Sequence, residues 1–184
     1  NDLIDGGDGD DWLDGGTGGD QIFGGAGTND VVAYGASTSA VNADLQSFTF
    51  SGGDATGDTY SGIEGVSGSA FNDNLSGDAN ANRLLGQAGT DTLAGRGGND
   101  FLQGGNDNDI FVFADNGGID SVADFDDFGD DTIQLSITGI TTFAQVQAVM
   151  TQSGADVLID FANTDIILTS TTLASMGSDD FTFV

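Results

Sequence analysis

The chain has no cysteine, histidine or lysine and only two arginines among its 184 residues. Without cysteine it cannot form disulfide bonds, so an extracellular fold would need another source of stabilisation. The missing side chains also exclude a Ser-His-Asp triad, a cysteine nucleophile, a Schiff-base lysine and an ordinary zinc site. A pair of carboxylates could in principle hydrolyse glycosides, but nothing in the sequence marks an acid with a raised pKa. We therefore expect that this chain is not an enzyme.

Positive charge is nearly absent, whereas thirty acidic residues give a net charge of −28 at pH 7. A chain so charged repels itself and is expected to stay largely unfolded without a counter-ion. Binding to nucleic acid or to an anionic membrane surface requires basic patches, so neither is expected as a partner. No apolar run reaches the roughly 18 residues of a membrane-spanning helix, so no membrane insertion is expected.

The most informative feature that is present is a repeat of nine residues. Oxygen-bearing side chains recur at this spacing, and a large apolar residue follows each of them by two positions. The first series is Asp2, Asp11, Asp20 and Asn29, and the second is Glu64, Asp73, Asn82, Asp91, Asp100 and Asp109. The apolar residues are Ile4, Leu13, Ile22 and Val31, then Val66, Leu75, Leu84, Leu93, Leu102 and Phe111. Charge that merely solvates a surface has no reason to recur at nine, so the pattern indicates ligands.

The units Gly6–Asp14 and Gly15–Phe23 both fit G-G-x-G-x-D-x-U-x, where U is a large apolar residue. Glycines at positions one, two and four permit positive φ and a close backbone approach, so a six-residue turn can direct its carbonyls inward. Position six adds a carboxylate, and Ca²⁺ takes about six to eight oxygens from such groups. The remaining x-U-x is a three-residue strand with only its middle side chain facing inward.

One repeat buries a single side chain, so the repeats must stack. Two nonapeptides make a coil of 18 residues, with strands alternating between two sheets and turns alternating between two edges. Turns 18 residues apart then lie about 4.8 Å apart, the ordinary strand spacing. The predicted partners at position six are Asp2 with Asp20, Asp11 with Asn29, Asp73 with Asp91, Asn82 with Asp100, and Asp91 with Asp109.

On these residues the chain resembles the RTX family of calcium-dependent secreted bacterial proteins. The resemblance implies an all-β fold, a right-handed parallel β-roll of calcium-binding nonapeptide repeats closed by a C-terminal cap. It also implies roughly five to eight Ca²⁺ ions, each held by position-six side chains and carbonyls of two stacked turns. The metal-binding residues implied in the repeats are Asp2, Gly7, Gly9, Asp11, Gly16, Gly18, Asp20, Gly25, Gly27, Asn29, Asp73, Asn82, Gly89, Asp91, Gly98, Asp100, Gly105 and Asp109.

Several turns depart from the consensus. Asn29 and Asn82 offer a neutral oxygen, Phe71 and Asp107 replace the position-four glycine, and Gly77–Leu85 lacks the double glycine. We expect sites built on those turns to be weaker, altered or empty. The strongest sites are expected around Asp11, Asp20, Asp91, Asp100 and Asp109.

The sequence divides into four segments. Residues 1–32 form a first repeat block, and residues 33–61 form a β insert with strand patterns at Ala40–Leu45 and Ser47–Ser51. Residues 62–113 form a second repeat block, and residues 114–184 form a C-terminal cap. Asn29 and Glu64 are 35 residues apart, one short of four nonapeptides, so the insert is expected to break the register.

In the cap, Gly118–Leu135 resembles the sequence that closes β-rolls in secreted RTX proteases. Asp120, Asp124 and Asp131 are expected to complete the last calcium turns, although acidic loop residues are often only solvated. Thr142–Ser153 predicts a short helix with a capping box between Thr142 and Gln145. Val157–Phe161 and Asp165–Leu168 predict a β-hairpin.

The chain begins within a repeat and without methionine, so we expect it to be part of a longer protein whose N-terminal portion is a further partner. Its last six residues, Asp179–Val184, resemble the uncleaved signal by which RTX proteins leave through type I secretion machinery. The expected function is a calcium-binding module that folds outside the cell and supports type I secretion and stability of a larger exported protein.

Two other functions remain open. Trp12, Phe23 and Phe101 occupy outward strand positions and could bind polysaccharide, as in accessory modules of secreted polysaccharide enzymes. The same rings could instead pack under the insert or against the missing N-terminal portion. A calcium-dependent adhesin segment is the third possibility, but the regular threonine array expected for ice binding is missing.

Overall fold

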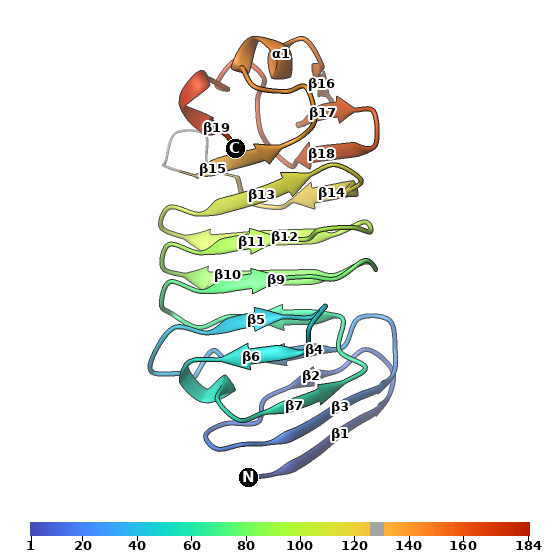
Figure 1. The fold of residues 1–184 in the computed structure, drawn as a ribbon, viewed down its shortest axis with the longest axis vertical. Coiled ribbons are helices and arrows are strands. Elements are labelled where there is room, and N and C mark those ends of the chain that lie inside the picture. Colours follow the sequence, from blue (N-terminus) through green and yellow to red (C-terminus); the bar gives the residue numbers. More distant parts are fainter. Residues whose placement is uncertain (126–130) are drawn as a thin grey trace.

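The chain winds into a stack of β coils that starts at the N terminus and ends in a cap at the C terminus (Figure 1). The structure is a computed structural model, and it describes residues 1–125 and 131–184. Within these residues no helix is long and apolar enough to cross a membrane. Residues 126–130 of the predicted closing segment Gly118–Leu135 lie outside the described part.

The described strands form two long sheets and one short sheet. The nine-stranded sheet has the order β16 (Met150–Ser153), β17 (Asp156–Phe161), β18 (Thr164–Leu168), β14 (Gly118–Val122), β12 (Phe101–Asn106), β10 (Arg83–Ala88), β8 (Gly65–Ser67), β4 (Val31–Ala33), β2 (Trp12–Leu13). The seven-stranded sheet has the order β19 (Phe181–Phe183), β15 (Thr132–Ser136), β13 (Ile110–Ala114), β11 (Thr92–Ala94), β9 (Asn74–Ser76), β5 (Asn42–Asp44), β6 (Thr49–Ser51). The short sheet contains β1 (Leu3–Asp8), β3 (Gln21–Ala26) and β7 (Thr59–Ser61).

Most neighbouring strands in the described part are parallel, and within the repeat blocks several pairs are 18 residues apart, as a roll of paired nonapeptides requires. Leu84 pairs with Leu102 in one sheet, and Leu75 pairs with Leu93 in the other. These side chains are fully buried between the sheets, because only the middle residue of each short strand faces inward. The predicted all-β parallel β-roll is therefore confirmed.

The first block contains a register shift that was predicted in the insert. Leu13 pairs with Val32, and not with Val31, because the turn at residues 24–30 has seven residues. The predicted inward position of Val31 was therefore wrong. The extra residue lies within this turn and not in the insert, and it moves Asp30 into the position predicted for Asn29.

The insert adds a hairpin to the roll. β5 pairs in parallel with β9, and β6 pairs antiparallel with β5, so the two predicted strand patterns are confirmed. A 3₁₀ turn at Gly53–Ala55 then leads to β7, which rejoins β3. Tyr34, Leu45 and Ala55 are buried against the main core, so the insert is packed onto the roll.

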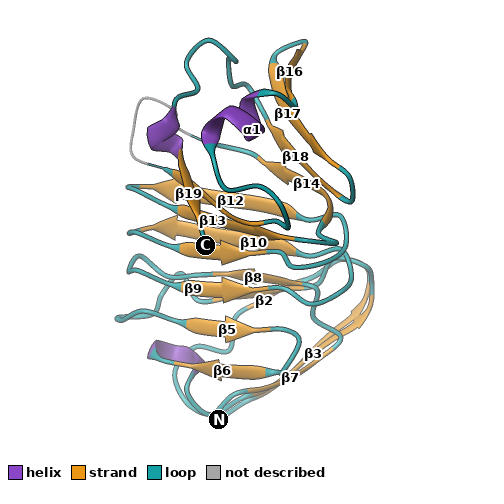
Figure 2. Cartoon of the chain, turned by 45° about the horizontal axis from the view of Figure 1, so that its top comes forward, coloured by secondary structure: helices purple, strands orange, loops and turns teal. Residues whose placement is uncertain are grey.

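The cap closes the last coil. The predicted hairpin is confirmed by the antiparallel pair of β17 and β18, and β18 already begins at Thr164. The predicted helix Thr142–Ser153 was too long, because α1 spans only Phe143–Gln147 and Met150–Ser153 forms β16. Pairing with β17 satisfies the backbone of β16, which outweighs the weak propensity of so short a helix. Figure 2 shows α1 beside these strands at the C-terminal end, where Val146 joins the core.

Candidate calcium sites

The glycine-rich turns share a backbone conformation with two left-handed residues. In the turn at residues 86–91, Gln87 at position two has φ 88° and Gly89 at position four has φ 104°. Asp107 also adopts φ 74°, so the turn at residues 104–109 keeps its shape although it lacks the position-four glycine. Phe71 has no such conformation, so the turn at residues 68–73 is built differently.

Position one needs glycine for space and not for a positive φ. A Cβ on Gly86 would overlap Asp91 Oδ2 and would lie 2.5 Å from the carbonyl oxygen of Gly104. The same crowding recurs at Gly95 and Gly104, where a Cβ would overlap the position-six carboxylate of the same turn. A carboxylate oxygen and a carbonyl oxygen from the next coil therefore converge above the position-one glycine.

The position-six side chains form a ladder along the turns. The backbone N–H of Asp73 donates to Asp91 Oδ1 at 2.7 Å, and that of Asp91 donates to Asp109 Oδ1 at 2.8 Å. Asn82 donates to Asp100 in the same way at 2.8 Å, and Asp2 donates to Asp20 at 2.5 Å. Four of the five predicted pairs are thus stacked as expected.

The fifth predicted pair was wrong, because Asp11 donates to Asp30 Oδ1 at 2.8 Å and not to Asn29. Asn29 keeps the spacing of nine residues, but of these two neighbours only Asp30 offers a carboxylate. Two further acceptors, which were not predicted as partners of the first block, continue the ladder beyond it. Glu64 Oε2 accepts the N–H of Asp30 at 3.1 Å, and Asp58 Oδ1 accepts that of Asp20 at 2.7 Å. No nine-residue signal marks Asp58.

The second carboxylate oxygen of several position-six residues has no partner. Among the described residues, buried Oδ2 atoms without any hydrogen bond belong to Asp11, Asp20, Asp30, Asp91, Asp100 and Asp109. A buried, unpaired anionic oxygen is costly, and a cation would remove that cost. Hard carboxylate and carbonyl oxygens, as gathered here, are the ligands that Ca²⁺ prefers. No group of three or more acidic side chains gathers at one point in the described part, so each turn would complete its site with backbone carbonyls.

Turns in the middle of the chain are closed by the protein itself. Ser69 donates from its N–H to Asp73 Oδ2 and from its hydroxyl to Asp73 Oδ1. Asn82 Oδ1 accepts the N–H of Asp78 at 2.7 Å, and Tyr60 donates its hydroxyl to Asp58 Oδ2 at 2.9 Å. These turns depart from the consensus, and their oxygens already have donors.

Arg96 places a protein cation at the same part of the roll. Its Nη1 donates to the carbonyl of Gly77, the position-one glycine of the Asn82 turn, at 2.7 Å. Both terminal nitrogens also bind the carboxylate of Asp44 in β5, at 2.9 and 2.8 Å. The hydrogen bond from Arg96 holds the pKa of Asp44 well below its ordinary value. The guanidinium thus ties the insert to the second block of repeats.

The glycines whose carbonyls are predicted as calcium ligands lie in turns with this backbone conformation. Most of the glycines have positive φ: Gly7, Gly9, Gly16, Gly18, Gly25, Gly89, Gly98 and Gly105. Gly27 differs because its turn has an extra residue, and a Cβ there would lie 2.9 Å from Asp30 Oδ1.

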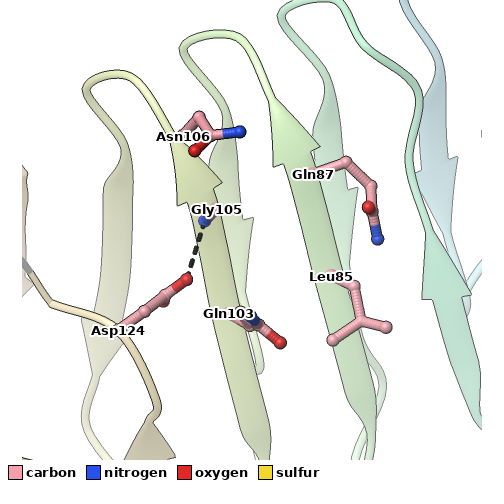
Figure 3. A pocket seen from close by; sticks show the side chains of 6 residues that line it. All are labelled: Leu85, Gln87, Gln103, Gly105, Asn106 and Asp124. Carbon is pink, nitrogen blue, oxygen red and sulfur yellow. Dashed lines mark hydrogen bonds between the residues drawn. The ribbon is translucent and has the colours of Figure 1, made fainter.

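The three acids predicted in the cap all lie on the turn stacks. Asp120 Oδ1 accepts the N–H of Asp100 at 3.0 Å, and Asp131 Oδ1 accepts that of Asp109 at 2.8 Å, so both extend the ladder. Asp124 instead accepts the N–H groups of Gly104 and Gly105 at 3.0 and 2.9 Å, the second of which is drawn in Figure 3. Asp124 therefore fastens the cap to the last complete turn.

Burial raises the pKa of four ladder carboxylates in the second block and the cap. Desolvation raises the pKa of Asp91 to about 8 and those of Asp109 and Asp120 to about 7. It raises the pKa of Asp100 to about 6. Neighbouring carboxylates add to this effect at Asp91 and Asp109. The fold without a cation therefore favours protonated carboxyls at these positions.

The sequence matches the RTX calcium-binding nonapeptide repeat in four copies, at residues 1–31, 58–93, 67–102 and 85–117. Among solved structures, the chain is similar to the extracellular lipase LipA from Serratia marcescens, with 22% identity and a TM-score of 0.46. The similarity covers 99% of this chain and 38% of the lipase chain, so this chain spans well under half of that protein. No curated protein matches the chain. The matched repeats include all six aspartates with an unpartnered oxygen.

Replacing Gly86 by alanine should weaken calcium-dependent folding, because the added Cβ would occupy the space between Asp91 Oδ2 and the Gly104 carbonyl. We expect the calcium concentration at half-folding to rise about tenfold or more, measured by far-UV circular dichroism. Gly35→Ala is the matched control, since a Cβ there meets nothing within 4 Å. Equal midpoints for the two variants would contradict the proposed position of the site.

The raised pKa values predict a pH dependence with a definite sign. Unfolded aspartates have a pKa of about 3.9, so the calcium-free fold is most stable below that pH and loses stability as the pH rises towards 8. In chelator, circular dichroism should show more β structure at about pH 5 than at about pH 8. The calcium midpoint should rise on acidification, because protons compete for the same oxygens.

Asp91→Asn is the control for this pH dependence, because it removes the group with the most raised pKa and should flatten the curve. A chelated chain with more β structure at about pH 8 than at about pH 5 would be the contrary result.

Proposed function

Because the chain belongs to the family of proteins with RTX calcium-binding nonapeptide repeats, we propose that it folds on extracellular calcium and supports secretion and stability of a larger exported protein. The observation that carries this proposal is the set of six buried carboxylate oxygens without a partner among residues 1–125 and 131–184. Each lies in a glycine-rich turn, and each would gain a cation. Ca²⁺ is then a folding ligand, because the stacked turns that bind it exist only in the folded chain.

We place the ions in two groups. One group lies at Asp11, Asp20 and Asp30, and the other lies at Asp91, Asp100 and Asp109. Six ions would bring twelve positive charges against a net charge of −28, which relieves much of the repulsion between coils. Between the groups, Ser69, Tyr60 and Arg96 supply the donors, so this part needs fewer ions.

The coupling of folding to calcium binding also suits export. In low calcium the charged chain stays extended and can pass through a narrow channel, and it folds where calcium is abundant. The proposed signal Asp179–Val184 lies in the cap, where β19 pairs with β15 and Phe181 is buried. A receptor could reach Phe181 only in the unfolded chain. Recognition before folding and calcium-driven folding afterwards therefore fit one sequence of events.

Asp91→Asn should raise the calcium concentration at half-folding about tenfold, because it removes a charged ligand and keeps the side-chain shape. Asp73→Asn is the matched control, because Asp73 occupies the same position one coil earlier. It should change the calcium midpoint less than about threefold, since Ser69 already bonds both oxygens of Asp73. Far-UV circular dichroism follows the titration, with magnesium as the ion control. A chain that folds equally well in chelator would contradict the proposal. Equal shifts of the calcium midpoint in the two variants would contradict the positions proposed for the ions.

Deletion of residues 179–184 should abolish export by a host with a type I system, because the deletion removes the proposed signal. The full chain should accumulate in the medium, and fusion of residues 114–184 should carry a passenger out of the cell. Immunoblots of medium and cells give the ratio of exported to retained chain. Calcium midpoints of the purified chains, measured in parallel, separate loss of the signal from loss of folding. Equal export of the truncated chain would rule out the signal.

A further inference from the structure

The outer face of the nine-stranded sheet carries a row of side chains from distant parts of the sequence. Strand pairing places Trp12 beside Val31, Val31 beside Gly65, Gly65 beside Arg83 and Arg83 beside Phe101. The next residue of each strand faces the core, so this row faces outward. Four strand spacings separate Trp12 from Phe101, which amounts to about 19 Å.

Trp12 stands at the side of a groove in this row. Its side chain is 56% exposed, whereas Val31 beside it is 2% exposed. Asp10, Asp11, Asn29 and Arg83 complete the lining of a groove of about 200 Å³. Gly65, the neighbour of Val31 in the row, adds no side chain, and a Cβ there would lie 2.8 Å from Val31 Cγ2. The indole therefore lies more than half exposed beside the polar groups of the groove.

Arg83 is one of only two basic side chains in a sequence with a net charge of −28. Its guanidinium carbon lies 4.6 Å from the centroid of the Phe101 ring, but no carboxylate in the described part pairs with it. The other arginine, Arg96, is bound to both oxygens of Asp44. Arg83 thus offers a planar group with free donors on the same face as Trp12.

A second hollow of about 290 Å³ lies on this face and shares strand β10 with the groove. Its lining includes the carboxamides of Gln87, Gln103 and Asn106, with Leu85 and Asp124 (Figure 3). Leu85 is two residues after Arg83, so the two hollows are about 7 Å apart along the strand. Gln87 Nε2 donates to Ser67 Oγ at 2.9 Å, which fixes the orientation of its amide.

These groups match the chemistry of a sugar chain. Aromatic rings pack against the apolar faces of pyranose rings, and carboxamides both donate to and accept from hydroxyls. The acidic surface repels polyanions, which favours an uncharged glycan. The length of the row exceeds one sugar ring, so an extended chain fits better than a monosaccharide.

We propose that this face binds a neutral polysaccharide. Trp12 stacks on one sugar ring, Arg83 with Phe101 supports the next part of the chain, and Gln87, Gln103 and Asn106 bind hydroxyls in the second hollow. The groove and the second hollow each border a calcium turn, through Asp11 and Gly105, so the site requires the folded, calcium-loaded sheet. Its test is therefore made on the calcium-saturated chain.

Trp12 is the sole tryptophan, so its fluorescence reports directly on the groove. Titration of the full chain with cellohexaose, laminarihexaose or mannohexaose should shift its emission saturably and protect it from acrylamide quenching with at least one of the three. An oligogalacturonate, which is anionic, should do neither. No response to any neutral hexasaccharide, or a response to the oligogalacturonate alone, would overturn the proposal.

Variants locate the site. Arg83→Ala and Gln103→Ala should each weaken binding about tenfold, measured by calorimetry, and Trp12→Ala should do the same in affinity gels. Phe48→Ala is the matched control, because Phe48 is 58% exposed but lies in the hairpin between β5 and β6. All four variants should keep the calcium midpoint of the parent chain. Undiminished binding by Trp12→Ala, or an equal loss in Phe48→Ala, would refute the proposed face.

Discussion

The whole roll depends on buried aspartates whose two oxygens have different tasks. Oδ1 accepts the backbone N–H of the ladder residue one coil earlier, so the carboxylate holds neighbouring coils together. Oδ2 faces the position-one glycine and the carbonyl of the next coil, and it has no donor of its own. The first contact fixes the carboxylate where it is desolvated, and the second leaves it needing a cation. Stability and calcium demand therefore come from the same side chain.

This dependence is not uniform along the stack. Near the insert, the ladder oxygens receive hydrogen bonds from Ser69, Tyr60 and the backbone of Asp78. The guanidinium of Arg96 occupies a turn carbonyl that would otherwise face the same space. A hydroxyl, an amide or a guanidinium offsets part of the desolvation cost without an ion, although burial still raises the pKa of Asp73. In the described part of the chain, the carboxylate oxygens without a donor therefore fall into two groups, and the stretch between them supplies its own donors.

Much of the fold was predictable because a period of nine residues leaves little freedom. The stacking of Asp91 on Asp109, the buried leucine ladders and the hairpin of β17 and β18 were all expected from spacing and alternation. The errors arose where local pattern and tertiary contact disagree. Asn29 fits the nine-residue spacing, but it is the carboxylate of Asp30 that accepts the N–H of Asp11 and continues the ladder. Residues 150–153 carry a helical pattern, yet pairing with β17 makes them a strand.

The sequence by itself determined the coil length, the inward apolar residue of each strand and the oxygen chemistry of the turns, because these depend on residues within one or two repeats. Only the tertiary structure decided which carboxylates stay without a donor. Some of those donors are remote in the chain, as Tyr34 is from Asp58 and Arg96 is from Asp44, whereas Ser69 and Tyr60 lie within four residues of the carboxylates that they bond. It also decided that Trp12, Arg83 and Gln103 share one face, because strand pairing joins what the sequence separates.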